Sequence, residues 1–142
     1  MIRNLRAADL PEWRRLWTGY LEFYGTSVSE DVYAATFARL LDPARPQWAL
    51  VAENGGRLVG LAHYIFHPHN WRIEDVCYLQ DLYVDPATRG TGAGRALIEG
   101  VYAAADANGT PQVWWLTQEG NGTARQLYDR MARVTPFIRY QR

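Results

Sequence analysis

Residues 78–95 contain Tyr78-Leu79-Gln80-Asp81-Leu82-Tyr83-Val84, then Asp85-Pro86, then Arg89-Gly90-Thr91-Gly92-Ala93-Gly94-Arg95. The first of these segments is rich in apolar and aromatic residues, which is typical of a buried strand. Beyond the glycines, apolar residues recur at the spacing of one helix face: Leu97, Ile98, Val101, Tyr102 and Ala105. We therefore expect the chain to pass from a strand through a glycine-rich loop into a helix.

Such a loop is suited to hold phosphate. Glycines let the backbone approach a ligand closely and adopt unusual dihedral angles. The first N–H groups of a helix have no intrahelical partners, and the positive end of the helix dipole lies behind them. Arg89 and Arg95 can add charge-assisted hydrogen bonds. A purely structural glycine turn is the weaker hypothesis, because three glycines alternate here beside two arginines.

The glycine spacing argues against the two commonest nucleotide-binding loops. The dinucleotide fingerprint G-x-G-x-x-G needs a glycine where the chain has Arg95 or Leu97. The nucleoside-triphosphate loop needs a lysine, whereas all 15 basic residues are arginine. The absence of lysine also excludes Schiff-base catalysis by a lysine amine.

The remaining sequence predicts a mixed α/β (α+β-like) domain. Asn54-Gly55-Gly56 is a strong hairpin signal, and Asp9 with Glu12 matches a capping box at the start of the first helix. Antiparallel hairpins precede a strand–helix–strand crossover, which should make a parallel pair. We expect strands at 2–6, 48–52, 58–66, 75–84, 112–117 and 137–140, and helices at 9–24, 29–41, 92–108 and 123–133.

The composition is that of one folded domain, residues 1–142, with 48% apolar and 13% aromatic residues. The 15 basic and 15 acidic residues give a formal net charge of zero, which argues against a nucleic-acid partner. No apolar run approaches the ~20 residues that span a bilayer, and Met1–Arg6 lacks the apolar segment of a signal peptide. We expect a cytoplasmic protein without a membrane partner.

Neither a disulfide nor a metal site is expected. Cys77 is the only cysteine and stands in an apolar stretch, so we interpret it as a small buried hydrophobe. Three histidines lie close together in the sequence, with Pro68 between two of them and no cysteine nearby, a poor arrangement for zinc. We expect His63, His67 and His69 at the surface or at the rim of a pocket.

The pattern R-x-x-G-x-G, formed here by Arg89, Gly92 and Gly94, resembles the pyrophosphate loop of the GNAT superfamily of N-acetyltransferases. Segments after the loop also follow the family's order: Val113-Trp114-Trp115-Leu116-Thr117, Asn121 and Ala124-Arg125-Gln126-Leu127-Tyr128. The likeness extends over 2–137, and residues 79–84 look closest to the histone/polyamine acetyltransferase branch. It implies a GNAT fold: a central, mostly antiparallel twisted sheet, one parallel pair splayed around the cofactor, and about four helices.

The resemblance implies acetyl-CoA as co-substrate and no metal. The pantetheine arm would be bound by backbone groups of Leu82, Tyr83 and Val84, and the pyrophosphate by the amides of 89–95. Asn121 would contact the pantetheine side of the cofactor. A role as an ordinary helix N-cap remains an equal alternative for Asn121.

Tyr128 is the implied general acid. The family commonly has a tyrosine here that protonates the departing thiolate. Helical spacing alone, beside Leu127 and Met131, favours a core aromatic instead.

The general base stays open. Related polyamine acetyltransferases have a glutamate where this chain has Gln80, and an amide cannot accept the proton of an ammonium at neutral pH. The candidates for the general base are therefore Asp81, Glu74, Asp75 or a chain of water molecules.

Substrate recognition would involve Tyr20, Tyr24 and Gln80, since aromatic faces can bind a cationic amine. Core packing is the alternative for both tyrosines. The expected reaction transfers an acetyl group by direct attack, in a ternary complex, to the primary amine of a polyamine, an amino acid or a peptide or histone lysine. The alternative function is a catalytically silent CoA-binding sensor or interaction module. A homodimer is also expected, because a strand at 137–140 would end the chain where a partner could complete the sheet.

Overall fold

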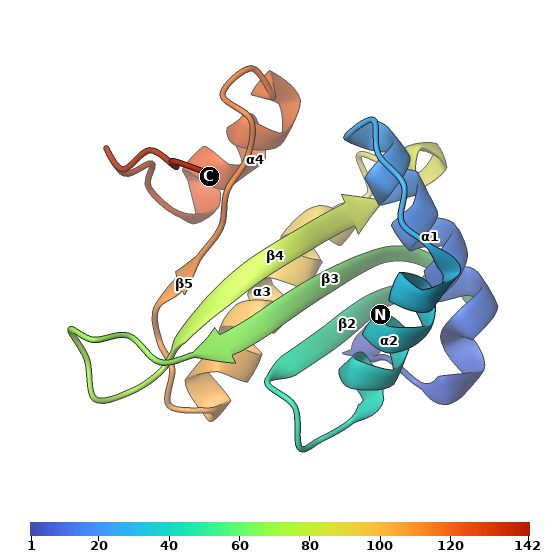
Figure 1. The fold of residues 1–142 in the computed structure, drawn as a ribbon. Helices are drawn as coiled ribbons and strands as arrows, with labels where there is room; N and C mark the ends of the chain where they lie inside the picture. The colour runs from blue at the N-terminus through green and yellow to red at the C-terminus, as the bar shows by residue number, and fades with distance from the viewer.

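The computed structural model describes residues 1–142 and contains one five-stranded sheet in the order β1-β2-β3-β4-β5 (Figure 1). The strands are β1 (Ile2–Asn4), β2 (Gln47–Asn54), β3 (Arg57–His67), β4 (Val76–Val84) and β5 (Val113–Trp114). The first four strands are antiparallel neighbours, and β4 and β5 form a parallel pair. The predicted mixed sheet with one parallel pair is therefore confirmed.

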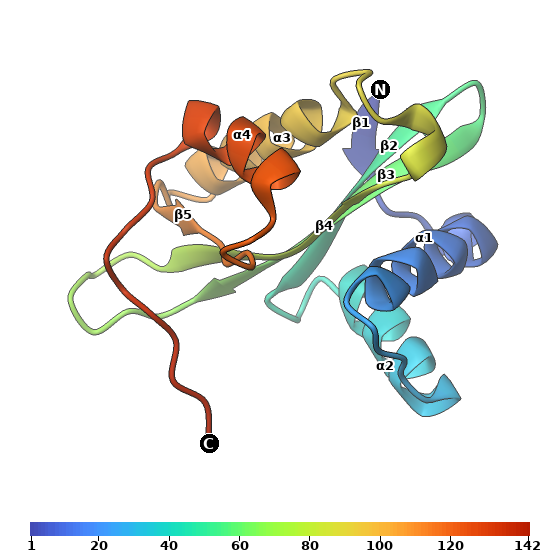
Figure 2. The same ribbon diagram turned by 90° about the horizontal axis from the view of Figure 1, so that it is seen from above.

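Helices cover both faces of the sheet. Figure 2 shows α1 (Leu10–Phe23) and α2 (Glu30–Leu41) on one side, and α3 (Ala93–Ala107) and α4 (Gly122–Met131) on the other. Because strand side chains alternate between faces, Val51 and Leu61 join the core beneath α1 while Leu50 and Ala62 join the core beneath α3. The sheet thus separates two apolar cores.

Several local predictions are confirmed. The second helix begins near Ser29 as expected, and the Ser29 side chain caps it by accepting a hydrogen bond from the Val32 amide. Gly55 and Gly56 make the turn between β2 and β3 with φ of 59° and 79°, as the predicted tight hairpin requires. Cys77 is fully buried.

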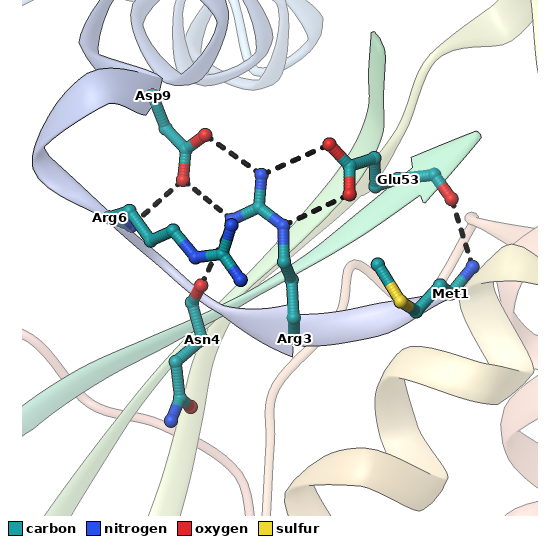
Figure 3. Close-up of polar contacts among 6 residues, drawn as sticks. All are labelled: Met1, Arg3, Asn4, Arg6, Asp9 and Glu53. Atoms are coloured by element: carbon teal, nitrogen blue, oxygen red, sulfur yellow. Dashed lines mark hydrogen bonds and ion pairs between the residues drawn. The ribbon is translucent and has the colours of Figure 1, made fainter. Parts of the chain in front are cut away.

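The start of α1 differs from the predicted capping box. The Asp9 carboxylate accepts a hydrogen bond from the Arg6 amide and binds the Arg3 guanidinium in a bidentate pair (Figure 3). Arg3 also binds Glu53 on β2, while Glu12 pairs with Arg15 instead of reaching back to the cap. A 3₁₀ turn at Ala7–Asp9 precedes α1 and carries Asp9 toward β1.

The predicted final strand is wrong. Residues 132–142 form no helix or strand, and Phe137, Ile138 and Tyr140 are 76–90% exposed. Strand propensity needs a neighbouring strand to pair with, and within the chain the sheet ends at β5. The strand expected at 112–117 is likewise reduced to Val113–Trp114. No helix has the length and hydropathy needed to cross a membrane.

Candidate active site

An opening forms where β5 leaves β4. The two strands pair only at Cys77–Val113 and Tyr78–Trp114, after which β5 ends and the chain runs toward α4 (Figure 1). From Leu79 to Val84, β4 has a neighbour only on its β3 side. Because alternate residues of a strand direct their N–H and C=O groups to opposite edges, this part of β4 offers unpaired backbone groups to the opening. Leu82, Tyr83 and Val84 lie here, where backbone contacts to a cofactor were predicted.

A β-bulge at Gln80 shapes the same strand. His63 pairs with Asp81 but Tyr64 pairs with Leu79, so Gln80 has no partner on β3. Gln80 is exposed, and Asp81 turns toward the α1 side of the sheet. A bulge bends its strand and increases the local twist, which fits the divergence of β4 from β5. No local sequence pattern indicates this bulge.

A cleft lies at this opening and gathers residues from α1, β4, α4 and the segment after β5. Its lining includes Tyr20, Tyr24, Gln80, Leu82, Trp115 and Tyr128. The Tyr20 and Tyr24 rings meet edge to face at 5.1 Å between centroids, as do Trp115 and Tyr128 at 5.5 Å. The structure therefore brings together the predicted substrate residues and the predicted general acid.

Tyr128, the predicted general acid, keeps its phenolic proton in this environment. Burial raises its pKa to about 12, with a smaller contribution from Tyr24, so the hydroxyl stays protonated at neutral pH. The ring packs against the core beneath α3 and also lines the cleft. The two interpretations of Tyr128, core aromatic and proton donor, are thus compatible.

Asp81 lies behind the cleft, between the sheet and α1. It is 9% exposed, and its Oδ2 accepts hydrogen bonds from His63 Nδ1 at 2.8 Å and from Trp17 Nε1 at 3.3 Å. Tyr20 lines the cleft, and its hydroxyl donates to the Gln80 carbonyl at 3.4 Å. Burial and the nearby Asp81 charge both raise the pKa of Tyr20 well above its ordinary value. Glu74 and Asp75 precede β4 and do not line the cleft.

The position expected for His63 is wrong. Its ring is buried and packs against Trp13 and Trp17 of α1, whereas His67 and His69 are partly exposed. The strand alternation of β3 directs residue 63 toward α1. The sequence spacing of the three histidines hides this difference, because residues 67 and 69 lie at and beyond the end of β3.

The glycine-rich loop has the geometry of an anion site. Gly90 and Gly92 adopt φ of 82° and 84°, a region that favours glycine. The backbone amides of residues 89–95 donate to no carbonyl of the chain, and α3 begins at Ala93. Arg95 pairs with Glu99 on the exposed face of α3, and Arg89 is exposed without an ion pair. These residues fit a diphosphate, which unpaired amides at a helix N-terminus can bind.

Asn121 immediately precedes α4, but its side chain accepts no hydrogen bond from the helix. Its Nδ2 donates to Thr117 Oγ1 at 3.4 Å. The structure therefore lacks the side-chain cap that was the alternative role for Asn121, while a contact with the cofactor stays a prediction.

Comparisons with known proteins agree with this geometry. The model of the acetyltransferase (GNAT) family matches residues 10–132. The D-amino-acid N-acetyltransferase HPA3 of Saccharomyces cerevisiae is 38% identical, over 100% of this chain and 89% of its own length. An uncharacterized N-acetyltransferase of Bacillus subtilis, YhfO, is 27% identical over 98% of this chain and 94% of its own.

Solved structures share the fold. AAC(6')-Iy, in complex with the bisubstrate analog CoA-S-monomethyl-acetylneamine, has a TM-score of 0.87 at 19% identity, covering 100% of this chain and 96% of its own. The ribosomal-protein-alanine N-acetyltransferase of Brucella melitensis has a TM-score of 0.82 at 22% identity, with coverage of 99% and 96%. The family match, the close relative and the shared fold establish that this chain belongs to the GNAT family and is an acyl-CoA-dependent N-acetyltransferase.

Proposed function

We propose that the protein acetylates the primary amine of a small amino acid, using acetyl-CoA. The observation that carries this proposal is the cleft beside the unpaired edge of β4, which Tyr128 lines together with the neutral polar residues Tyr20, Tyr24 and Gln80. No charged side chain lines this cleft. Hydroxyl and amide donors suit the carboxylate of an amino acid, whereas a polyamine would need several carboxylates along its length.

The name of the HPA3 relative, a D-amino-acid N-acetyltransferase, supports the same substrate class. It does not favour the histone/polyamine branch that residues 79–84 resemble. The polyamine and the peptide lysine are therefore the alternatives that the substrate test must include.

Acetyl-CoA brings the acetyl group as a thioester, which a neutral amine can attack. The amides of residues 89–95 would hold the diphosphate, since they have no other acceptor. The unpaired groups of β4 at 82–84 would bind the pantetheine arm as a neighbouring strand does. The Asn121 side-chain amide makes no hydrogen bond to α4 and would add a contact to the cofactor from the α4 side.

Two residues of this chain would handle the protons. The amine must lose a proton when its nitrogen bonds to the acetyl carbon, and we assign that proton to Asp81, reached through Tyr20 or water. As the carbon–sulfur bond breaks, Tyr128 would donate its phenolic proton to the departing sulfur. Its raised pKa keeps that proton available at neutral pH.

Turnover of an amine panel tests this function. Purified protein is incubated with acetyl-CoA and D-amino acids, L-amino acids, spermidine or a lysine peptide, and both the released thiol and the acetylated product are measured. The single cysteine is buried, so its thiol should add little background. Acetylation of amino acids in preference to the other amines is the expected result. Binding of CoA without acetylation of any amine would support the sensor alternative instead.

A homodimer is a second proposal. It is supported by the exposed apolar residues of the C-terminal segment, since large exposed apolar patches commonly mark an interface. The cytoplasmic location and the absence of nucleic-acid and membrane partners stay predictions.

A further inference from the structure

A buried chain of hydrogen bonds lies between α1 and the sheet. Trp13 is fully buried and His63 is 4% exposed. Trp13 Nε1 donates to His63 Nε2 at 2.9 Å, and His63 Nδ1 lies 2.8 Å from Asp81 Oδ2. Both the Trp17 bond and the His63 bond go to Oδ2, so Asp81 Oδ1 takes part in neither. None of Trp13, His63 and Asp81 lines the cleft.

The donors and acceptors in this series of hydrogen bonds define which nitrogen of His63 carries a proton. An indole N–H can only donate, so His63 Nε2 must accept and cannot carry a proton. A neutral imidazole has one N–H, which must then be on Nδ1 and donate to Asp81. An imidazolium would set a second N–H against the Trp13 N–H, and the buried site offers that proton no acceptor. His63 is therefore confined to its neutral Nδ1–H form.

We propose that Trp13 and His63 are positioning residues that orient Asp81 for the acetyl transfer, with the Trp13 N–H fixing the His63 tautomer that donates its Nδ1–H to Asp81. This inference rests on the role of Asp81 in the proposed function. A second N–H on the ring, at Nε2, would point at the Trp13 N–H, so the geometry keeps the ring in the tautomer that donates Nδ1–H to Asp81 Oδ2.

Other titratable groups around the pair are tyrosines. Burial raises the pKa of Tyr20 on α1 and of Tyr24 at the C-cap of α1, and the Asp81 charge raises both further. On β4, Tyr78 lies close enough to interact with Asp81. On α2, Tyr33 packs edge to face on Trp13 and Trp17. A cation on these elements is Arg14, whose guanidinium lies 4.0 Å from the Tyr33 ring centroid, and Arg139 acts on Tyr78. No positive group touches Asp81, so the pair depends on hydrogen bonds to hold its charge.

NMR of the imidazole nitrogens tests the protonation state directly. Long-range ¹H–¹⁵N spectra of the labelled wild-type protein are recorded from about pH 5 to pH 8, and the His63 signals are identified by their loss in His63→Gln. We expect His63 to stay protonated on Nδ1 alone throughout. In Trp13→Phe, the His63 imidazole should gain a second proton between about pH 5 and pH 8. A wild-type His63 that titrates there, or that carries its proton on Nε2, overturns the proposal.

Kinetics test whether the pair serves the reaction. We expect His63→Leu to lower kcat at least about tenfold with little change in the KM for acetyl-CoA. His63→Gln should recover much of the loss, because an amide can both accept from Trp13 and donate to Asp81. In Trp13→Phe, the acidic limb of the kcat/KM profile should move to higher pH. The control Trp48→Phe removes an indole from the core beneath α3, away from any histidine bond, and should leave the profile in place.

These outcomes separate the two proposals. If the wild-type protein acetylates no amine, the proposed function fails, whereas the tautomer of His63 can still be read from the spectra. If the protein turns over normally and His63→Leu keeps the wild-type kcat at every pH, the positioning role fails and the acetyltransferase function stands.

Discussion

Tyr78 and Trp114 stack face to face, with ring centroids 4.1 Å apart and planes 8° apart, at the last paired position of β4 and β5. Beyond this stack the strands separate, and the cleft begins. Trp114 is also held by a 3.3 Å hydrogen bond from its Nε1 to His67 Nε2. The stack therefore closes one end of the opening in which the pantetheine arm is proposed to lie.

Trp114→Ala should widen the junction between β4 and β5. An aromatic pair contributes about 0.5–1.5 kcal/mol beyond the area it buries, so thermal stability should fall by a few degrees. The affinity for CoA, measured by calorimetry, should weaken because the edge of β4 loses its defined spacing from β5. Trp71→Ala is the control, since Trp71 is 81% exposed in the β3–β4 loop. Equal CoA affinity in both variants would contradict the role given to the stack.

Tyr128→Phe should lower kcat by roughly 100-fold, the lower end of the effect of a general acid. The fold should be preserved, because the Tyr128 ring supplies the packing and its hydroxyl makes no hydrogen bond within the chain. Tyr102→Phe is a matched control on α3: it removes a hydroxyl that donates to the Met131 carbonyl at 2.9 Å. That variant should lose stability and keep kcat. A Tyr128→Phe enzyme with wild-type kcat would exclude the phenol as the proton donor.

Gly92→Ala should weaken CoA binding. Gly92 has a φ of 84° at the start of α3, where a Cβ would meet no atom within 4 Å but the backbone would be strained. The strain costs roughly 1–2 kcal/mol and would be relieved by turning the loop amides away from the diphosphate. Gly56→Ala provides the control, because Gly56 has a φ of 79° in equally open space in the β2–β3 hairpin. Both variants should lose similar stability, and only Gly92→Ala should show a higher Kd for CoA in calorimetry.

The sequence predicted features that depend on a few adjacent residues. The hairpin at Gly55 and Gly56, the start of the second helix near Ser29 and the loop at 89–95 each follow from the backbone needs of a short segment. The general acid, in contrast, was proposed from the family resemblance, because the local helical spacing around Tyr128 favours a core aromatic. The positions of the loop and the general acid relative to one another came only from the structure.

The missed features depend on partners distant in the sequence. The bulge at Gln80 exists because His63 pairs with Asp81 while Tyr64 pairs with Leu79, a register that no local pattern shows. The burial of His63 depends on which face of β3 meets α1. The residues at 137–140 have strand propensity, but no strand of the same chain lies beside them. In each case the tertiary neighbour decides the outcome and the local preference does not.

The exposed C-terminal segment leads to a prediction about assembly. Phe137→Asp together with Ile138→Asp should convert a dimer to a monomer in multi-angle light scattering, because two charges replace side chains that are 80% and 76% exposed in the single chain. Val32→Asp, a similar change at a 41% exposed position of α2, should leave the mass unchanged. A wild-type protein that is already monomeric at high concentration would refute the dimer.

Stability should fall in alkaline solution. Burial raises the pKa of Cys77 from 9.0 to about 12, and that of Tyr64 from 10.0 to about 12. A group whose pKa is higher in the folded state stabilises that state fully below the unfolded pKa, and this stabilisation is lost as the pH rises toward the folded pKa.

The urea midpoint should therefore be constant up to about pH 8 and decline above pH 9, where Cys77 of the unfolded chain ionises first. Each such group contributes a slope of about 1.4 kcal/mol per pH unit in the free energy of unfolding. Cys77→Ala should delay the decline to about pH 10, where tyrosines of the unfolded chain ionise; an unchanged onset would show that the Cys77 thiol ionises equally in both states.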